Sequence, residues 1–301
     1  MPFNPILAKL VPLLAAVPVL TGQDGGQQAS TVDIVAIGID RHDRMTVPVR
    51  IGASGPFNFL IDTGAQNTVL SKTLAAQLSL VTTGKARLVG IAGTEIVDTV
   101  DIEEIGLGRR SYYSLLAPLL DQAHIGAQGI IGLDTLQGQR VVLDFKRKLI
   151  TIDDAKNLGG NRGFDIIVTA KRRSGQLIMA NAVIDGVPTE VVIDTGTETS
   201  IGNPALQRAM ARRHEQETAI LTSVTGQEIE AQMGIGRKLV VGDMIISNLL
   251  IAYADAPAFG ALDLDKRPAI LLGMRDLRTF DRVAIDFAAR KILFDLPREA
   301  F

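Results

Sequence analysis

The pattern of apolar and polar positions predicts a chain built mainly of β-strands. From Thr31 onward, short apolar stretches alternate with polar residues and are separated by Gly, Asp and Asn. A period of two is typical of half-buried strands, and the separating residues favour tight turns. Helical stretches are few. Residues 72–78 follow the capping residue Ser71, and residues 204–213 follow a second one. We therefore expect an all-β fold with few short helices.

The chain contains the same series of elements twice, at a spacing of about 130 residues. In each half an apolar strand ends in Asp-Thr-Gly, at Asp62 and at Asp194. The strand follows a predicted hairpin turn, Ser54-Gly55-Pro56 in the first half and Asp185-Gly186 in the second. A helix-capping residue, Asn203 in the second half, stands nine residues after each Asp. A period this long excludes a solenoid repeat and indicates two similar lobes.

The correspondence continues beyond these motifs. Gly93 and Gly226 stand 31 and 32 residues after the two motif Asp residues, and each predicts the tip of a hairpin. Farther along, residues 129–132 match residues 269–273, since both stretches are apolar and end in Gly. Each half then closes with two apolar strands, at residues 141–145 and 149–152 in the first half and at 283–287 and 292–294 in the second.

A polar, glycine-rich stretch, residues 157–163, separates the two halves. A chain of 301 residues has room for two ordinary domains or for one domain made of two lobes. We expect three parts. Residues 1–30 form a signal-like or anchor segment plus a polar linker, residues 31–160 an N-terminal lobe, and residues 161–301 a C-terminal lobe.

The N-terminal segment resembles a secretory signal peptide. Lys9 precedes the apolar stretch 10–20, and the polar residues 22–28 follow it. Such a short apolar stretch is too short to span a bilayer comfortably. Pro12 and Pro18 weaken a helix there, and no clear small-x-small cleavage site follows. We expect an exported protein, periplasmic or secreted. The alternatives are an apolar leader and a tether at the membrane surface.

Charge and cysteine content exclude several classes of function. The net charge is −2 and the sequence pI is about 6.0, whereas nucleic-acid-binding domains usually carry a basic stripe. Cysteine is absent, which excludes disulfides, a cysteine nucleophile and a thiolate metal site. His42, His124 and His214 are scattered without metal-ligand spacing. We expect no nucleic-acid partner, no metal and no other cofactor.

The two Asp-Thr-Gly motifs carry the candidate chemistry. One copy would be weak evidence, because Asp and Gly are common where a strand ends in a turn. Two copies at the same point of a duplicated lobe are far more specific. An Asp at the end of a buried strand is costly unless its carboxylate is hydrogen-bonded or functional. Asp62 and Asp194 are therefore the candidate catalytic residues.

Leu60–Ala65 and Val192–Thr197 resemble the active-site strands of the pepsin and retropepsin superfamily of aspartic proteases. Ile130-Ile131-Gly132 and Leu271-Leu272-Gly273 resemble its second signature, an apolar-apolar-Gly strand beside the catalytic loop. The resemblance covers about residues 44–296. It implies a two-lobed acid-protease fold with pseudo-twofold symmetry and an active-site cleft between the lobes.

The resemblance also assigns roles around each Asp. Thr63 and Thr195 are expected to interlock across the axis, while Gly64 and Gly196 let the two loops approach closely. Two Asp side chains brought together share one proton. They can activate a water that hydrolyses a peptide bond without a covalent intermediate.

The two loops differ at the residue after the motif glycine. Thr197 can donate a hydrogen bond to the outer oxygen of Asp194, whereas Ala65 has no hydroxyl to offer Asp62. A donor favours the charged form of a carboxyl. We therefore expect Asp194 to be the more readily ionised member and Asp62 to carry the proton.

Both Gly-containing hairpin tips resemble the flaps of this superfamily. In the retropepsin branch each half supplies a flap, whereas in the pepsin branch only the first lobe does, and that flap carries a Tyr. Tyr112 and Tyr113 fall on the strand after the first tip, so neither tip has a Tyr. The chain thus resembles a fused retropepsin dimer, and a monomer should suffice for activity. The candidate flap and substrate-binding residues are Ala92, Gly93, Thr94, Thr225, Gly226 and Gln227.

We expect an aspartic endopeptidase that binds a polypeptide as an extended strand and processes a specific protein. One alternative is a non-catalytic peptide-binding module on the same fold. Another is a degradative protease with broad specificity. The second flap has its own alternative, because residues 225–227 also fit a simple tight turn.

Overall fold

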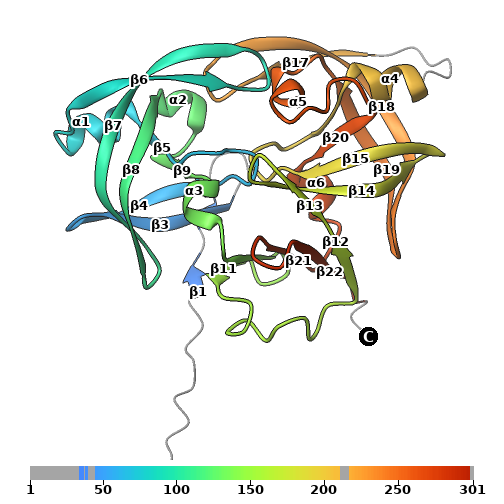
Figure 1. The fold of residues 1–301 in the computed structure, drawn as a ribbon, viewed down its shortest axis with the longest axis horizontal. Helices are drawn as coiled ribbons and strands as arrows, with labels where there is room; N and C mark the ends of the chain where they lie inside the picture. Colours follow the sequence, from blue (N-terminus) through green and yellow to red (C-terminus); the bar gives the residue numbers. More distant parts are fainter. Residues whose placement is uncertain (1–33, 37, 40–44, 211–216, 299–301) are drawn as a thin grey trace, which may run out of the picture. The chain divides into compact units, whose positions relative to one another are not determined.

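The computed structural model describes residues 34–36, 38–39, 45–210 and 217–298. β-Strands dominate these residues and form three sheets, two of eight strands and one of six (Figure 1). The prediction of an all-β fold with few short helices is confirmed. Among these residues, no helix has the length and apolarity needed to cross a membrane. The signal-like segment 1–30 lies outside them, so the expected export stays a prediction.

The first eight-stranded sheet comes entirely from the first half of the chain. Its strands, in spatial order, are β2 (Gly38–Ile39), β3 (Met45–Ile51), β4 (Ser54–Ile61), β9 (Gly129–Ile131), β5 (Val69–Ser71), β8 (Arg110–Leu120), β7 (Thr94–Leu107) and β6 (Thr82–Val89). Its helices are α1 (Lys72–Gln77), α2 (Gln122–Ile125) and α3 (Leu133–Leu136). Strand β9 lies parallel to β4 and antiparallel to β5, so the end of β4 lies inside the sheet.

The second eight-stranded sheet repeats this arrangement with the second half. Its strands, in spatial order, are β13 (Lys171–Arg173), β14 (Gln176–Ile184), β15 (Val187–Ile193), β20 (Ala269–Leu272), β16 (Ser200–Gly202), β19 (Met244–Tyr253), β18 (Glu228–Val241) and β17 (Thr218–Thr222). Its helices are α4 (Pro204–Met210), α5 (Pro257–Ala261) and α6 (Met274–Leu277). Strand β20 lies parallel to β15 and antiparallel to β16, as β9 does in the first sheet. The two sheet lobes expected from the duplication are present.

The six-stranded sheet takes three strands from each half. Its order is β1 (Ile34–Ala36), β11 (Leu149–Asp153), β10 (Arg140–Asp144), β21 (Arg282–Asp286), β22 (Lys291–Asp295) and β12 (Ile166–Thr169). The halves meet where β10 pairs antiparallel with β21. Because this sheet is shared, the described halves are joined by main-chain hydrogen bonds and not by the linker alone. The boundary predicted between residues 160 and 161 stays a prediction.

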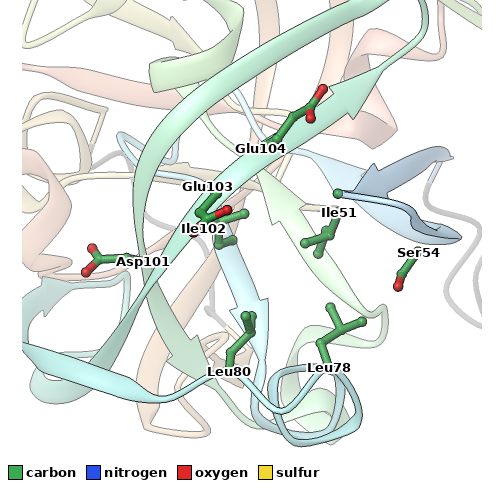
Figure 2. Close-up of a pocket in the computed structure, with 9 residues that line it drawn as sticks. Ile51, Ser54, Leu78, Leu80, Asp101, Ile102, Glu103 and Glu104 are labelled. Carbon is green, nitrogen blue, oxygen red and sulfur yellow. The ribbon is translucent and has the colours of Figure 1, made fainter.

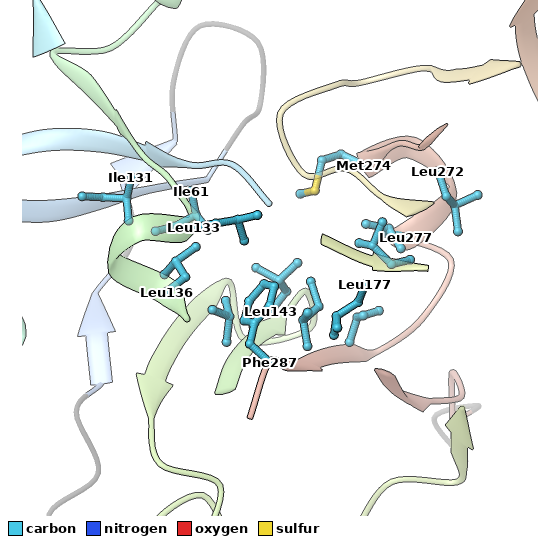
Figure 3. Close-up of a cluster of buried hydrophobic side chains, with 14 of the residues drawn as sticks. Ile61, Ile131, Leu133, Leu136, Leu143, Leu177, Leu272, Met274, Leu277 and Phe287 are labelled. Carbon is cyan, nitrogen blue, oxygen red and sulfur yellow. The ribbon is translucent and has the colours of Figure 1, made fainter. Parts of the chain in front are cut away.

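One hydrophobic cluster extends through all three sheets. In Figure 3, Leu143 and Phe287 lie between side chains of the first half, such as Ile61, and side chains of the second half, such as Leu272. Full burial of one such side chain stabilises the fold by about 1.5–3 kcal/mol. Ile61 and Ile193, the residues before the two motif Asp residues, both belong to this cluster. The strands that carry the motifs are therefore anchored in one common core.

A buried ion pair ties the halves together within the shared sheet. Arg140 and Asp286 are directly paired residues of β10 and β21, and both side chains are almost fully buried. Arg140 donates to Asp286 Oδ2 through Nη2 at 2.7 Å and through Nε at 3.1 Å. It also donates to the main-chain oxygen of Gly160 and to Asn161 Oδ1. The pair thus fastens the linker between the halves to the sheet.

Both predicted helix caps are confirmed. Ser71 Oγ accepts a hydrogen bond from Leu74 N at 3.1 Å, and Asn203 Oδ1 accepts one from Leu206 N at 2.8 Å. These bonds satisfy main-chain N–H groups that have no partner inside the first turn of a helix. Helix α1 ends one residue before the predicted end. The predicted end of α4 falls in residues 211–216, outside the described part of the chain.

Of the two predicted hairpin turns, one is confirmed and one is wrong. Asp185 and Gly186 form the β14–β15 turn with φ values of 47° and 88°. The β3–β4 turn lies at Gly52–Ala53, because Gly52 takes a φ of 54° and Ile51 pairs with Ser54. Ser54-Gly55-Pro56 is therefore part of β4. Gly55 (φ 124°) marks the place where the strand register shifts, and a Cβ there would lie 2.9 Å from the main-chain oxygen of Val49.

Candidate active site

The two motif Asp residues occupy matching positions, each directly after the strand that carries it. Asp62 N donates to Ile131 O at 3.0 Å, and Asp194 N donates to Leu272 O at 3.0 Å. Each of these bonds extends the parallel pairing of β4 with β9 or of β15 with β20 by one residue. Both Asp loops are therefore fixed to a central strand of their own sheet.

The threonines of the two motifs join the loops to each other. Thr63 N donates to Thr195 Oγ1 at 3.0 Å, and Thr195 N donates to Thr63 Oγ1 at 3.2 Å. In return, the Thr63 hydroxyl donates to Ile193 O and the Thr195 hydroxyl to Ile61 O, both at 2.8 Å. Both side chains are buried. The interlock that the resemblance implied is present as four reciprocal hydrogen bonds.

Each motif glycine lies against the carboxyl of the opposite loop. A Cβ added at Gly64 would lie 2.7 Å from Asp194 Oδ1, and one added at Gly196 would lie 2.6 Å from Asp62 Oδ1. Any side chain at these positions would collide with a carboxyl group. The absence of side chains lets the two Asp residues approach each other, as the sequence predicted.

Main-chain N–H groups hold both carboxyls. Asp62 Oδ1 accepts from Gly64 N at 2.7 Å and from Ala65 N at 3.1 Å. Asp194 Oδ1 accepts from Gly196 N at 3.0 Å. N–H donors of this kind stabilise a carboxylate without a cation. The site can therefore hold a negative charge.

The surroundings of Asp194 favour its protonated form. Its side chain is buried, and burial together with the neighbouring charge of Asp62 raises its pKa to about 8. Asp62 is the more exposed of the two. This direction runs against the expectation that Asp194 would be the more readily ionised member. The Thr197 hydroxyl donates to the main-chain oxygen of Asp194 at 3.4 Å and not to its carboxyl, so burial decides the asymmetry.

The second signature supports the loops from the side. A Cβ at Gly132 would lie 2.5 Å from Asn67 O, and one at Gly273 would lie 2.8 Å from Glu198 O. The residues that follow these glycines donate N–H groups to Ala65 O and Thr197 O, both at 2.9 Å. Both glycines thus lie beside the site, and their lack of a side chain permits the close contact.

Sequence reasoning missed a hydroxyl–carboxylate pair behind each loop. Thr68 Oγ1 donates to Asp134 Oδ1 at 2.7 Å and accepts from Gly132 N at 3.2 Å. In the second half, Ser200 Oγ donates to Asp276 and accepts from Gly273 N at 3.0 Å. The available signal was an Asp two or three residues after the apolar-apolar-Gly strand in both halves.

The predicted flaps are the β6–β7 and β17–β18 hairpins, and their tips meet. A Cβ at Gly93 would lie 2.9 Å from Gln227 Cδ, and one at Gly226 would lie 2.7 Å from His124 Nε2. Ile91 packs against a hydrophobic cluster of the second half, and Val224 against one of the first half. Each tip therefore reaches the opposite lobe, and the second hairpin is more than a local tight turn.

The remaining predicted flap residues lie in or beside these tips. Ala92 is in the first turn, and Thr94 is the first residue of β7. Thr225 Oγ1 is hydrogen-bonded to Ser223 Oγ at 2.6 Å within the second turn. All six predicted flap residues are thus at the two hairpin tips.

Two of the cavities formed by the described residues lie away from the motif residues. One, of about 330 Å³, has Leu78 and Leu80 on one side and the acidic side chains of Asp101, Glu103 and Glu104 on the other (Figure 2). The other, of about 370 Å³, lies between β6 of the first flap and α5. Within the described ranges, no group of three or more His, Asp or Glu side chains is arranged to hold a metal ion.

Comparison with known proteins agrees with this geometry. Residues 47–135 and 180–275, more than half of the chain, match the family described as "Aspartyl protease". The chain is also similar to the protein DNA-DAMAGE INDUCIBLE 1 of Arabidopsis thaliana, with 29% identity over 101 residues. That match covers 32% of this chain and 24% of the relative, so it spans about a quarter of the relative's length.

Proposed function

The chain belongs to the aspartyl protease family, and we propose that it is an endopeptidase whose catalytic residues are Asp62 and Asp194. The observation that carries this proposal is the mutual packing of each carboxyl against the other loop's glycine. Two carboxyls held this close share one proton, which is the condition for paired acid and base catalysis. Burial keeps that proton on one defined member of the pair.

In the proposed reaction, Asp62 is the general base and Asp194 the general acid. Asp62 accepts a proton from a water molecule held between the two carboxyls, and the water oxygen attacks the peptide carbonyl. Protonated Asp194 donates a hydrogen bond to the carbonyl oxygen as negative charge develops there. The tetrahedral intermediate then collapses, the C–N bond breaks, and the leaving amine takes up the proton that Asp62 accepted from the water. Measured pKa values will belong to the pair.

The proposed substrate is a polypeptide bound as an extended strand beneath both flaps. The flap hairpins expose main-chain groups that can pair with such a strand. Since Gly93 contacts Gln227 and Gly226 contacts His124, the tips must separate before a polypeptide can enter. Both Asp residues come from one chain, which supports activity in the monomer. We further propose a specific protein substrate, because two closed flaps restrict entry.

A peptide-library digestion tests the proposal. Wild type is compared with Asp62→Asn, Asp194→Asn and the control Asp243→Asn, which changes an exposed Asp in the β18–β19 turn. We expect cleavage by wild type and the control. In either motif variant we expect the cleavage rate to fall at least about a thousandfold, because catalytic residues that act as a unit fail together when one is removed.

Equal cleavage by wild type and both motif variants would refute the catalytic assignment. Binding of peptides by wild type without cleavage would instead support the non-catalytic peptide-binding alternative. Cleavage at many unrelated sequences would argue against a specific substrate.

A further inference from the structure

A glutamine of the second half reaches the catalytic loop of the first. Gln176 is the first residue of β14, and its side chain is buried. Its Nε2 donates a hydrogen bond to Gly64 O at 2.6 Å. This contact joins residues 112 positions apart and comes in addition to the threonine interlock.

The bond acts on the peptide group that holds Asp62. Gly64 C=O and Ala65 N–H belong to one planar peptide unit, so fixing the oxygen also fixes the direction of the N–H. That N–H donates to Asp62 Oδ1 at 3.1 Å. A donor on the carbonyl oxygen also polarises the amide and strengthens the bond its N–H makes. Gln176 therefore influences Asp62 through one intervening peptide.

No described residue donates a hydrogen bond to Gly196 O, the carbonyl that corresponds to Gly64 O. The carboxyl on that side, Asp194, has a pKa raised by burial and by the charge of Asp62. Among the described residues, Asp194 is a titratable side chain that faces Asp62, and main-chain N–H groups of both loops donate to the pair.

Stability alone does not account for a glutamine at this position. Gln176 Oε1 is buried and accepts no hydrogen bond from the described residues. An unsatisfied buried acceptor costs about 1–3 kcal/mol, and an apolar side chain of the same size would remove that cost. The contribution of the amide therefore comes from its Nε2 donor, which is bonded to Gly64 O.

We propose that Gln176 is a positioning residue, which orients the Gly64–Ala65 peptide from the opposite lobe so that Asp62 serves as the base of the pair. This inference rests on the proposed function. Gln176 does not touch the reacting atoms and acts through the peptide.

The test is the pH profile of kcat/KM for Gln176→Met, compared with Gln139→Met. Gln139 is the matched control. It is also a buried Gln, its Nε2 donates to a main-chain oxygen (Thr135 O, 2.8 Å), and its Oε1 also lacks a partner. We expect Gln176→Met to lower kcat about tenfold with little change in KM, and the control to keep the wild-type profile.

In Gln176→Met the acid limb should move to higher pH, because a base that has lost part of its hydrogen bonding takes up a proton more readily. Gln176→Glu gives an independent readout. Its protonated carboxyl can donate to Gly64 O, whereas the ionised form adds a negative charge beside the pair. Gln176→Glu should therefore be active at low pH. As the pH rises, its activity should decline at a lower pH than the activity of wild type does.

An unchanged acid limb in Gln176→Met would overturn the inference. So would a lower KM at unchanged kcat, which would mean that Gln176 only occupies an oxygen that substrate uses. Carbon-13 NMR titration of labelled Asp carboxyls in wild type and Gln176→Glu adds a readout that needs no activity. If wild type cleaves nothing, the proposed function fails, while an unaltered carboxyl titration refutes the role of Gln176 alone.

Discussion

Gly64 of one loop lies against the carboxyl of Asp194 in the other, so closely that a Cβ would come within 2.7 Å of Oδ1. Gly64→Ala should therefore push the carboxyls apart. Because displacement of a catalytic group by about 1 Å can cost a hundredfold, kcat/KM should fall at least that far.

The matched control is Gly260→Ala in α5, where an added Cβ would meet nothing within 4 Å and φ is not positive. Cleavage assays and urea unfolding of both variants separate the site from general stability. Full activity in Gly64→Ala would contradict the packing described for the two loops.

The threonine interlock should contribute to both stability and activity. Thr63→Val removes a hydroxyl that donates to Ile193 O and accepts from Thr195 N, and leaves both groups buried without partners. We expect a loss of about 1–3 kcal/mol in the free energy of unfolding, with a lower kcat. Thr218→Val, at an exposed strand position, should change neither quantity. In a double-mutant cycle with Thr195→Val, simple additivity would show that the two residues do not act together.

Activity should persist at neutral pH and decline as the pH rises through about 8, the pKa to which burial and the charge of Asp62 raise Asp194. Above that pH the pair loses the proton that the carbonyl oxygen requires. The measurement is kcat/KM against pH with a peptide that has no titratable groups. A decline already complete at pH 5 would contradict the raised pKa.

The same pKa predicts how stability varies with pH. A carboxyl whose folded pKa is raised binds a proton in the folded state that the unfolded state has released. Its contribution to stability is therefore complete below about pH 4 and is lost as the pH rises toward 8. Asp194→Asn removes this dependence. At pH 8 the variant should be more stable than wild type by a few kcal/mol. The measurement is the free energy of unfolding in urea at pH 4, 6 and 8. If this free energy varies with pH in the same way in both proteins, the argument is wrong.

The buried pair between Arg140 and Asp286 should be sensitive to the loss of one partner. Arg140→Met leaves the Asp286 carboxylate without its cation in the shared sheet. We expect the free energy of unfolding to fall by about 3–5 kcal/mol. Adding Asp286→Leu should recover much of that loss, since the double variant has no buried charge. The exposed pair Lys85–Asp98 is the control, and Lys85→Met should cost less than about 1 kcal/mol.

The second flap tip offers a test of its contact with the first lobe. Gly226→Ala combines a positive φ (83°) with a clash against His124, and should raise KM several-fold by displacing the tip. Gly242→Ala shares the positive φ (58°) but meets nothing within 4 Å, so it reports the backbone effect alone. Equal KM values in the two variants would show that the His124 contact does not position the flap.

Much of this architecture could be predicted because it depends on local signals that occur twice. The Asp-Thr-Gly loops, the caps at Ser71 and Asn203 and the Asp185-Gly186 turn follow from side-chain chemistry within a few residues. The β3–β4 turn was misplaced because three turn-forming residues follow Gly52, and only the strand register shows which glycine turns the chain.

Features that depend on distant contacts escaped prediction. Thr197 suggested an ionised Asp194, but its hydroxyl faces the main chain, and the burial that raises the pKa arises from packing of the whole lobe. Gln176 carries no sequence signal at all, because its partner Gly64 lies 112 residues away. The pairing of β10 with β21 also needed the structure, since both strands appeared only as closing strands of their own halves.

That pairing has a consequence for how the molecule comes into being. Without β21, strand β10 would present a row of open main-chain donors and acceptors, a template on which another chain can add. Because β21 occupies the place in the second half that β10 occupies in the first, two copies of a single half could pair through this edge. Because both halves belong to one chain, the edge of β10 that could associate with another molecule is instead paired inside the shared sheet. A nascent chain must be synthesised as far as residue 286 before β10 can pair with the whole of β21.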